Sequence, residues 1–312
     1  MSRSIPTENR ISTLPDPILH HILSFLPTKS AASTTILSKR WKPLWLSVPT
    51  LHFDDRPFKN FISFRHFVSS VFLLRDTNLP IRSFYLICSK QHSDEHDINR
   101  FIYAAVQRGG IENLDLNMFV NDLVVVDLPH LKTIHLYGVL LQRYEYLPKI
   151  LLRCPNLEEL DIKHVLLSTP QTLDLEENLP NLIRANTYNS TVLLTLCCRA
   201  EVLHVEVNLM HLRSNCQFPM YHNLIYMELI LENNHSEKWK WLLEVLNHCP
   251  KLQNLTIHED SGYEVVDNWI DPTIVPECLS TQLRTCLLKG YKNTKAPNDN
   301  EINFVQKGLN NM

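Results

Sequence analysis

A repeated leucine pattern between residues 81 and 257 is the feature that most constrains how this chain can fold. Four segments align without gaps, and each reads L-x-x-L-x-L or a close variant after a turn that contains proline: LPHLKTIHL, CPNLEELDI, LPNLIRANT and CPKLQNLTI. Four weaker copies share the pattern, and the first apolar positions follow one another at about 20–30 residues, the spacing of a leucine-rich repeat. These leading positions are Ile81, Ile111, Leu131, Leu157, Leu182, Ala200, Leu224 and Leu252.

Each copy predicts a short strand whose alternate side chains point to opposite faces. One such strand cannot bury its apolar face alone, so the copies must stack into a curved parallel sheet with helical or irregular returns. Helical spacing of apolar residues predicts returning helices at 58–74, 97–108 and 239–246, with Asp97 as an N-cap. The sequence therefore predicts an α/β leucine-rich-repeat solenoid, and the alternative is an ordinary α/β domain with leucine-rich strands.

The strand register predicts which side chains line the concave face of the solenoid. Polar, aromatic and acidic groups on a rigid concave sheet suit protein or peptide binding, although strand residues that face water are often polar without any such role. The four acids among them, Asp115, Asp161, Glu206 and Glu228, favour a basic patch on the partner. The candidate target-binding residues are the fifth positions of the repeats: Tyr85, Asp115, His135, Asp161, Asn186, His204, Glu228 and Thr256. The flanking outward positions include Tyr137, Glu159, Arg184, Tyr188, Glu206, Tyr226 and His258.

Composition argues against several functional classes. Only 6 glycines occur among 312 residues, and no GxGxxG or GxxxxGK[ST] sequence is present for binding phosphate. A net charge of −3 provides no basic footprint for nucleic acid. No apolar run approaches the roughly 18 residues of a membrane span, and the first residues, MSRSIPTENR, lack the apolar stretch of a secretory signal. We therefore expect neither nucleic acid nor a membrane as a partner, and a location in the cytoplasm, the nucleus or both.

Enzyme chemistry also lacks a plausible set of residues. The 8 cysteines form no CxxC pair, and their spacing predicts reduced, mostly buried thiols. The string HSDEH at 92–96 matches the HxxEH sequence of inverted zinc proteases, but its polar surroundings predict a loop and supply no third ligand. No GxSxG or Cys–His signature is found. We therefore expect no catalytic residue, no metal site and no cofactor.

Residues 9–55 predict a small module of three short helices. Asp16 is a suitable N-cap for the first helix, Pro17 a suitable first helical residue, and Thr28 a suitable cap for the second helix. Helices this short bury little surface, and the module has more apolar side chains than one interior can hold. The excess predicts either an exposed docking patch or packing against the rest of the chain.

The run LPDPILHHILSFLPTK, followed by ILSKRWKPLW, resembles the plant type of F-box across this whole module. Pro17 departs from the family, which usually has glutamate at that position. The resemblance implies docking on the Skp-type adaptor of an SCF ubiquitin ligase, which connects the protein to a cullin. The positions that match the family's adaptor-binding residues are Leu14, Pro15, Ile18, Leu19, Ile22 and Trp41, the last of these being at least partly core in the family.

Residues 269–293, WIDPTIVPECLSTQLRTCLLKGYKN, resemble the opening of the FBD domain that follows leucine-rich repeats in many plant F-box proteins. In that family a helix and further strands follow, whereas this chain continues only to EINFVQKGLNNM, so we expect a truncated FBD region with a last strand at 283–288. The predicted domains are an F-box at 8–55, a leucine-rich-repeat solenoid at 56–262 and a partial FBD-like segment at 263–312.

Together these resemblances imply a plant protein of the F-box/FBD/LRR family. Such a protein is a non-catalytic, substrate-recognition subunit of an SCF-type ligase, in which the F-box binds the adaptor and the concave face binds a target protein. The alternative is a leucine-rich-repeat scaffold that binds proteins but is decoupled from ubiquitination.

Overall fold

The computed structural model divides the chain into two compact units, Met1–Met118 and Phe119–Met312, called unit 1 and unit 2 below. No helix among the described residues is both long enough and apolar enough to cross a membrane. The residues that the structure describes are 11, 13–89, 95–118, 127–141, 146–163, 166–167, 178–188, 190–208, 218–232, 238–259 and 275–289.

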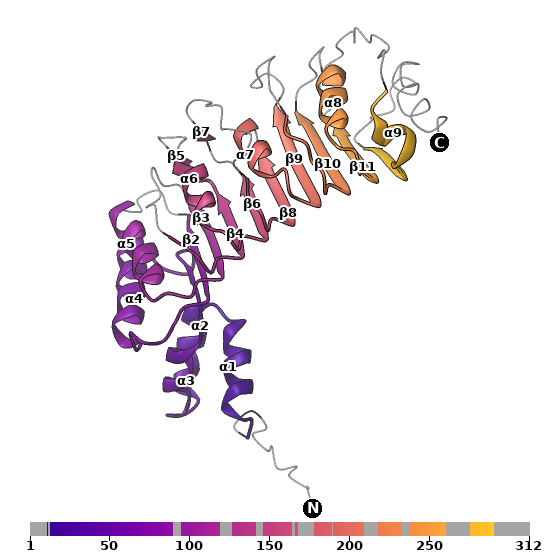
Figure 1. The fold of residues 1–312 in the computed structure, drawn as a ribbon. Helices are drawn as coiled ribbons and strands as arrows, with labels where there is room; N and C mark the ends of the chain where they lie inside the picture. The colour runs from indigo at the N-terminus through magenta and orange to yellow at the C-terminus, as the bar shows by residue number, and fades with distance from the viewer. Residues whose placement is uncertain are drawn as a thin grey trace, which may run out of the picture. The chain divides into compact units, whose positions relative to one another are not determined.

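Unit 1 begins with three short helices, as predicted (Figure 1). The third helix packs against the first two, and their shared interior includes Leu23, Ala31, Leu44 and Trp45. The helices are α1 (Asp16–Ser24), α2 (Thr28–Ser33) and α3 (Trp41–Ser47), with a 3-10 turn, η1 (Thr34–Ile36), after α2.

The predicted caps of the first two helices are wrong by one residue. Pro15 and Pro27 occupy the N-cap positions, and neither makes a side-chain capping bond. The φ angle that the proline ring imposes suits the extended backbone before a helix. Asp16 and Thr28 are therefore the first helical residues, and their side chains bind other elements instead of capping their own.

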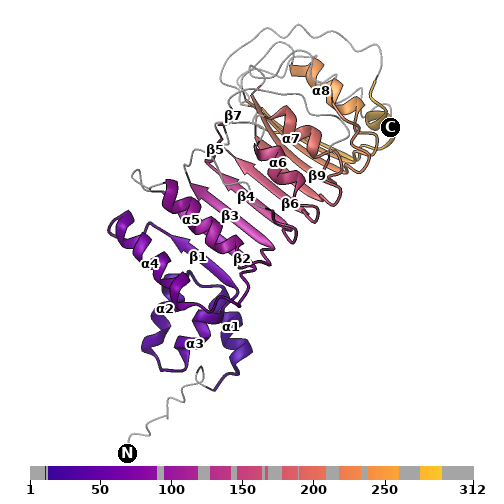
Figure 2. The ribbon, with the colours of Figure 1, turned by 60° about the vertical axis from the view of Figure 1, so that its left-hand side comes forward.

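Three parallel strands follow in unit 1, with the middle strand paired to both others. The connecting helices pack against each other and lie on one face of these strands (Figure 2). The first strand has the alternating burial of a half-buried strand but was not predicted, because its residues fall at the end of the helical module. The elements are β1 (Thr50–Asp54), α4 (Phe61–Leu74), β2 (Ser83–Cys88), α5 (Glu95–Val106) and β3 (Asn113–Met118).

Asp97 is not the N-cap that the sequence predicts. It is the third residue of α5, it is buried, and its carboxylate accepts a hydrogen bond from Arg65 on α4 at 3.1 Å. The helix begins earlier, at Glu95, so the carboxylate joins two helices of the unit instead of starting one of them.

Unit 2 contains seven strands of the main sheet among its described residues, and they follow one another in chain order. All neighbouring pairs in this order are parallel. The strands are β4 (Thr133–Tyr137), β6 (Glu159–Lys163), β8 (Arg184–Tyr188), β9 (Val202–Asn208), β10 (Tyr226–Glu232), β11 (Asn254–Glu259) and β12 (Thr285–Lys289).

The returns of unit 2 lie on one face of this sheet, where Figures 1 and 2 show α6, α7 and α8. Two short parallel strands pair separately from the main sheet. These elements are α6 (Tyr146–Leu152), α7 (Thr191–Leu196), α8 (Lys238–Asn247) and α9 (Glu277–Thr281), with β5 (Leu140–Leu141) and β7 (Leu166–Leu167) as the separate pair.

Successive repeats of unit 2 are joined by a shared backbone contact where each strand begins. The carbonyl of Lys132 accepts hydrogen bonds from the N–H groups of both Glu158 and Glu159, at 2.8 and 2.9 Å. Because each repeat supplies the hydrogen-bond acceptor for the first N–H groups of the next strand, the repeats stack in fixed register. The carbonyls that accept two N–H groups in the same way are those of Glu158, Ile183, Glu201, Ile225 and Gln253.

Asparagines form a second link between repeats. Asn156 and Asn181 each follow a proline, and their side-chain amides donate to the carbonyls of Pro129 and Pro155 in the preceding repeat, at 2.7 and 2.8 Å. Asn223 donates in the same way to the carbonyl of Arg199, at 3.4 Å. The proline-containing turns that mark the repeats in the sequence thus also carry contacts between them.

The predicted fold class is confirmed: an α/β chain with a small helical module followed by parallel leucine-rich-repeat strands. All eight leading positions are at most 2% exposed. All eight predicted strands form, and β12 forms where a last strand was expected. Seven cysteines are described, all of them free and all but Cys286 buried, and burial raises the pKa of thiols such as Cys154, to about 12.

A buried hydroxyl tests how tightly unit 2 is packed. Tyr221 is 1% exposed, and its hydroxyl donates to the carbonyl of Leu194 at 3.1 Å. Tyr221→Phe should lower the free energy of unfolding by about 1–3 kcal/mol, because the buried carbonyl loses its donor. Urea denaturation measures the change, and Tyr103→Phe, at a position 51% exposed, should have almost no effect. Equal midpoints for the two variants would contradict this description of the core.

Candidate protein-docking surfaces

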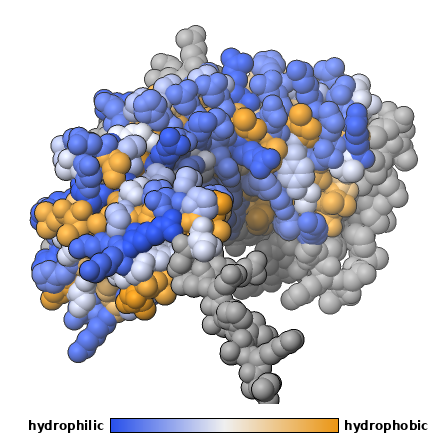
Figure 3. All heavy atoms as spheres, turned by 90° about the horizontal axis from the view of Figure 1, so that it is seen from below, coloured by the Kyte–Doolittle hydropathy of each residue, from blue (hydrophilic) through white to orange (hydrophobic). Residues whose placement is uncertain are grey.

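Helix α1 presents an apolar face to solvent. Ile18, Ile22 and Phe25 are 47%, 40% and 73% exposed, whereas Leu19 and Leu23 on the other side are almost fully buried. Spacings of four and three residues place the exposed side chains on one face of the helix. Figure 3 shows apolar areas of the surface in orange, broken up by blue hydrophilic side chains. Some of the excess apolar side chains of the module are therefore exposed, which agrees with the predicted alternative of an exposed docking patch.

Two further exposed apolar residues follow helix α2. Ile36 and Leu37 are 87% and 60% exposed, at the end of η1 and directly after it. They are not among the adaptor-binding residues that the F-box resemblance implies. The sequence feature that could have indicated their exposure is the pair of polar stretches on either side of them, TT before and SKR after.

The six predicted adaptor-binding residues fall into two groups. Pro15, Ile18 and Ile22 are exposed, and Leu14 is half-buried. Leu19 and Trp41 are 0% and 4% exposed, so their side chains support the helices from inside. Leu14, Pro15, Ile18 and Ile22 therefore lie on a partly exposed segment, at and just before helix α1. The other two residues lie in the core.

Arg40 holds the start of α1 against the segment that precedes α3. Its guanidinium donates to the carboxylate of Asp16 and, at 2.7 Å, to the carbonyl of Leu14. Both side chains of the ion pair are substantially exposed, so the pair orients the turn more than it stabilises the fold. The Leu14-Pro15 turn is thus positioned by a residue of the KRW sequence.

Helix α2 is attached to the first strand of the same unit. The hydroxyl of Thr28 accepts a hydrogen bond from the N–H of His52 in β1, at 2.8 Å. The ammonium of Lys29 donates to the carbonyl of Pro57 at 3.0 Å and lies 4.1 Å from the ring centroid of Phe58. The helical module and the first repeat are therefore linked by several contacts and not only by the chain.

A buried arginine makes another of these links. Arg75 is 3% exposed, and it donates to the carbonyls of Leu46 and Val48 at 2.8 and 2.6 Å and to that of Pro80 at 3.2 Å. Burial and, next, the charge of Arg108 lower its pKa to about 10, which leaves it charged at neutral pH. The guanidinium thus joins the end of α3 to the entry of β2. No motif in the sequence marks this residue.

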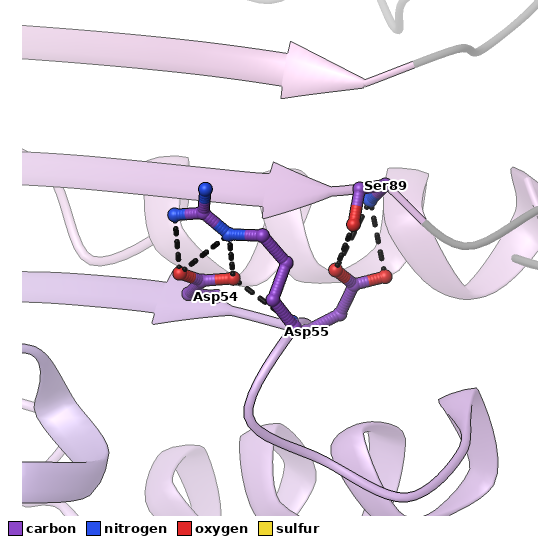
Figure 4. Close-up of polar contacts among 4 residues, drawn as sticks. Asp54, Asp55 and Ser89 are labelled. Atoms are coloured by element: carbon purple, nitrogen blue, oxygen red, sulfur yellow. Dashed lines mark hydrogen bonds and ion pairs between the residues drawn. The ribbon is translucent and has the colours of Figure 1, made fainter.

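A buried carboxylate joins the ends of the first two strands, as Figure 4 shows. Asp55 is 0% exposed, and it accepts hydrogen bonds from the N–H of Ser89 at 3.1 Å and from its hydroxyl at 2.8 Å. Beside it, Arg56 binds the carboxylate of Asp54. Partial burial acts to raise the pKa of Asp54, but the hydrogen bonds and charge of Arg56 outweigh it and lower the pKa. These carboxylates are engaged in structural contacts.

The fifth positions of the repeats form register-matched rows on the face of the strands opposite the helices, called the open face below. In unit 1 Tyr85 pairs with Asp115, and His52 extends the row on the other side. In unit 2 the row contains His135, Asp161, Asn186, His204, Glu228 and Thr256. The predicted register is therefore correct in both units.

Thr256 differs from the other members of the row because it is only 4% exposed. It stands in register between Glu228 and Leu287, with His258 two residues along the strand. Its short side chain lies among these larger ones and offers little surface to a partner. The other fifth positions are half-buried.

The most closely connected group on the open face spans three neighbouring strands of unit 2. His204 Nδ1 lies 2.7 Å from Glu228 Oε2, and His258 Nε2 lies 2.5 Å from Glu228 Oε1. The hydroxyl of Tyr226 donates to the same carboxylate at 3.3 Å, and its ring contacts the ring of His204. We call the three titratable residues the His–Glu–His cluster.

Two opposing effects set the pKa of Glu228. Burial raises it, and the hydrogen bonds and charges of His258 and His204 lower it by more, so that the pKa lies below the ordinary value. Glu228 is therefore ionised at neutral pH, and its charge persists further into the acidic range than that of an ordinary glutamate.

Two other acids of this face have a basic side chain nearby. Asp161 Oδ2 lies 3.8 Å from Lys163 Nζ, and Glu159 Oε1 lies 3.9 Å from His135 Nε2. The four acids on which a basic partner patch was predicted therefore do not form one uniform acidic surface. Asp115, moreover, belongs to unit 1 and the other three to unit 2.

No group of three His, Cys, Asp or Glu side chains within the described residues can hold a metal ion. Of the HSDEH string, Glu95 and His96 open helix α5, and residues 92–94 lie outside the described part. Of the FBD-like stretch, 275–289 is described, whereas Trp269 and residues 290–293 lie outside it.

Comparison with known proteins agrees with this architecture. The family model of the F-box domain matches residues 11–53. An FBD-associated F-box protein of Arabidopsis thaliana is 27% identical across 94% of this chain and 88% of its own length. A putative F-box/FBD/LRR-repeat protein of the same plant is 26% identical across 93% of this chain and 85% of its own length. A putative F-box/LRR-repeat protein is 32% identical, but over 57% of this chain and 42% of its own length.

A small helical module followed by stacked parallel repeats is the architecture of F-box proteins with leucine-rich repeats. The N-terminal module of this chain is an F-box domain. Its relatives across most of its length are the FBD-associated F-box and F-box/LRR-repeat proteins of plants, which is the family that the sequence resembles.

The link through Arg75 can be tested by substitution. Arg75→Lys keeps the charge but cannot donate in the forked geometry that reaches Leu46, Val48 and Pro80 together. We expect the free energy of unfolding to fall by about 2 kcal/mol, because at least one buried carbonyl loses its donor. Urea denaturation measures the change. The control is Arg82→Lys at an exposed position, which should change the free energy of unfolding by less than about 0.5 kcal/mol. An unchanged Arg75→Lys midpoint would show that the link is dispensable.

The lowered pKa of Glu228 predicts a pH dependence of stability. A carboxylate with a depressed pKa in the folded state stabilises the fold above its unfolded pKa, and this contribution is lost as the pH falls through the folded pKa. We therefore expect the stability difference between the natural protein and Glu228→Gln to be present above about pH 5 and to shrink as the pH falls from there toward about 3. Urea unfolding at a series of pH values measures it, and a difference that grows as the pH falls from about 5 to about 3 would contradict the assigned shift.

Proposed function

We propose that this chain is the substrate-recognition subunit of an SCF-type ubiquitin ligase. F-box domains generally bind Skp-type adaptors, and the adaptor in turn connects to a cullin. The observation that carries the proposal is the exposed apolar face of α1, formed by Ile18, Ile22 and Phe25 within the residues that match the F-box family. An apolar patch of this kind on a small module is typical of a docking site.

The open faces of the repeats supply the second surface that a receptor needs. Half-buried tyrosine, histidine, asparagine and acidic side chains stand there in fixed register, on a sheet whose other face is filled by the core. A rigid, aromatic and polar surface suits recognition of a folded partner or a peptide. We propose that this surface binds the target protein.

The contribution to ubiquitin transfer is positional in this proposal, and the chain itself performs no chemistry. A receptor that holds its target near the charged transfer enzyme raises the effective concentration of the target lysine. The contacts through Thr28, Lys29 and Arg75 support this role, because they fix the adaptor-binding helices to the first repeat within unit 1. Action in the cytoplasm or the nucleus is part of the same proposal.

The adaptor-binding face can be tested by truncating its side chains. Ile18→Ala combined with Ile22→Ala should weaken binding to a purified Skp-type adaptor at least about tenfold, because central apolar anchors carry most of the affinity of an interface. Binding is measured by isothermal titration, and circular dichroism checks that the helices remain folded.

The matched control removes two apolar side chains that are even more exposed, from another helix of unit 1. Ile62 and Leu73 on α4 are 57% and 85% exposed, and their double alanine variant should bind the adaptor like the natural protein. If the natural protein does not bind the adaptor, the proposed receptor function is refuted, and the alternative of a protein-binding scaffold decoupled from ubiquitination is favoured.

A further inference from the structure

The segment between helices α2 and α3 carries exposed basic side chains next to exposed apolar ones. Lys39 follows the exposed Leu37 by two residues, and Lys42 lies in the first turn of α3, where it is also exposed. The N–H of Trp41 donates to the carbonyl of Ser38 at 3.1 Å and closes the chain into a turn. Side chains three residues apart on such a turn are neighbours, so the two lysines form one pair on the surface.

The lysine pair belongs to the same surface as the start of helix α1. Arg40, which stands between the two lysines in the sequence, donates to the carbonyl of Leu14 at 2.7 Å and binds the carboxylate of Asp16. These contacts hold the segment beside the turn from which α1 and its exposed apolar face begin. An apolar centre with charged groups at its border is the usual anatomy of a protein–protein interface.

The charges of the lysine pair are not neutralised within the described part of the chain, where neither ammonium has an acidic partner. Residues 11–53, which match the F-box family, contain only one acid, Asp16, and it pairs with Arg40. The ammonium of Lys29 is directed to the carbonyl of Pro57, at 3.0 Å, and not to a carboxylate. The F-box therefore presents positive charge to solvent beside its exposed apolar residues.

Charge is distributed unevenly along the chain. Residues 11–53 contain four lysine or arginine residues and one acid, a net charge of +3 with neutral histidines, whereas the whole chain carries −3. The remaining residues therefore carry −6. An acidic partner is attracted to the F-box and repelled by the rest of the chain, so that charge directs the encounter to the docking surface. A basic partner would be directed away from it.

We propose that Lys39 and Lys42 form a basic rim of the adaptor-binding surface, and that this rim recognises acidic side chains beside the apolar groove of the Skp-type adaptor. The inference rests on the proposed receptor function and adds the chemistry of the partner surface, an apolar groove bordered by carboxylates. The rim acts mainly on the rate of association, because exposed charges attract a partner at a distance but add little to the stability of a hydrated contact. The apolar face of α1 then holds the complex together.

Stopped-flow mixing of the full chain with a purified Skp-type adaptor tests the rim. The association rate constant should fall at least about tenfold between about 25 mM and about 500 mM salt, because ions screen the attraction between exposed charges. Lys39→Gln combined with Lys42→Gln should lower the rate constant at low salt at least about threefold. The dissociation rate constant, and the association rate constant at high salt, should change less than about twofold.

The matched control is Lys251→Gln combined with Lys289→Gln, which removes two charges from exposed positions of unit 2. It should lower the association rate constant at low salt by less than about 1.5-fold. An association rate that does not fall with salt, or equal rates for the two double variants at low salt, would overturn the basic rim while the receptor function stands, since the adaptor still binds. A natural protein that does not bind the adaptor at either salt concentration would refute the receptor function, and the rim with it.

Discussion

The leading apolar side chain of each repeat can be buried only between its own returning segment and the strands on either side of it. This constraint explains why the strands are parallel, why they follow chain order and why every leading position is at most 2% exposed. It also determines the functional surface, because filling one face of each strand with leucine leaves the other face to polar and aromatic residues. The register that buries the core therefore brings side chains from distant parts of the sequence into one row.

A second constraint concerns the F-box, which is too small to hide all of its apolar residues. Part of the excess lies exposed on α1, and the module gains further support from the first repeat through Thr28, Lys29 and Arg75. A protein that works by holding one partner near another needs such attachment, because a loose joint would dilute the effective concentration that proximity provides. The same contacts thus serve stability and the proposed function.

The sequence predicts this fold well where periodicity is strong, and less well where single contacts decide. The leucine pattern predicts eight strands and their outward rows, since alternation and spacing are properties of the chain itself. The caps at Asp16 and Thr28 and the start of α5 at Asp97 are wrong, because prolines and side chains distant in sequence determine those ends. Strand β1 was missed because it lies within the stretch assigned to the helical module.

The candidate sites show the same division. The F-box resemblance selects Ile18 and Ile22, which are exposed, but also Leu19 and Trp41, which are buried, because a motif does not distinguish a contact from its support. Arg75 could not have been selected, since its role depends on three carbonyls that only the folded chain brings together. The His–Glu–His cluster needs the register of three strands before its residues can be recognised as one group.

The central claim is that one chain binds a ligase through its F-box and a target through its repeats. Affinity capture of the full chain from plant cells with the proteasome blocked tests it most directly, with the natural protein and the Ile18→Ala, Ile22→Ala variant compared side by side. The receptor function predicts that the adaptor and a cullin are recovered with the natural protein and lost with the variant, while a common set of other proteins stays bound and carries ubiquitin only with the natural protein. Recovery of neither adaptor nor cullin with the natural protein, or equal ubiquitination of the bound proteins in both samples, would contradict it.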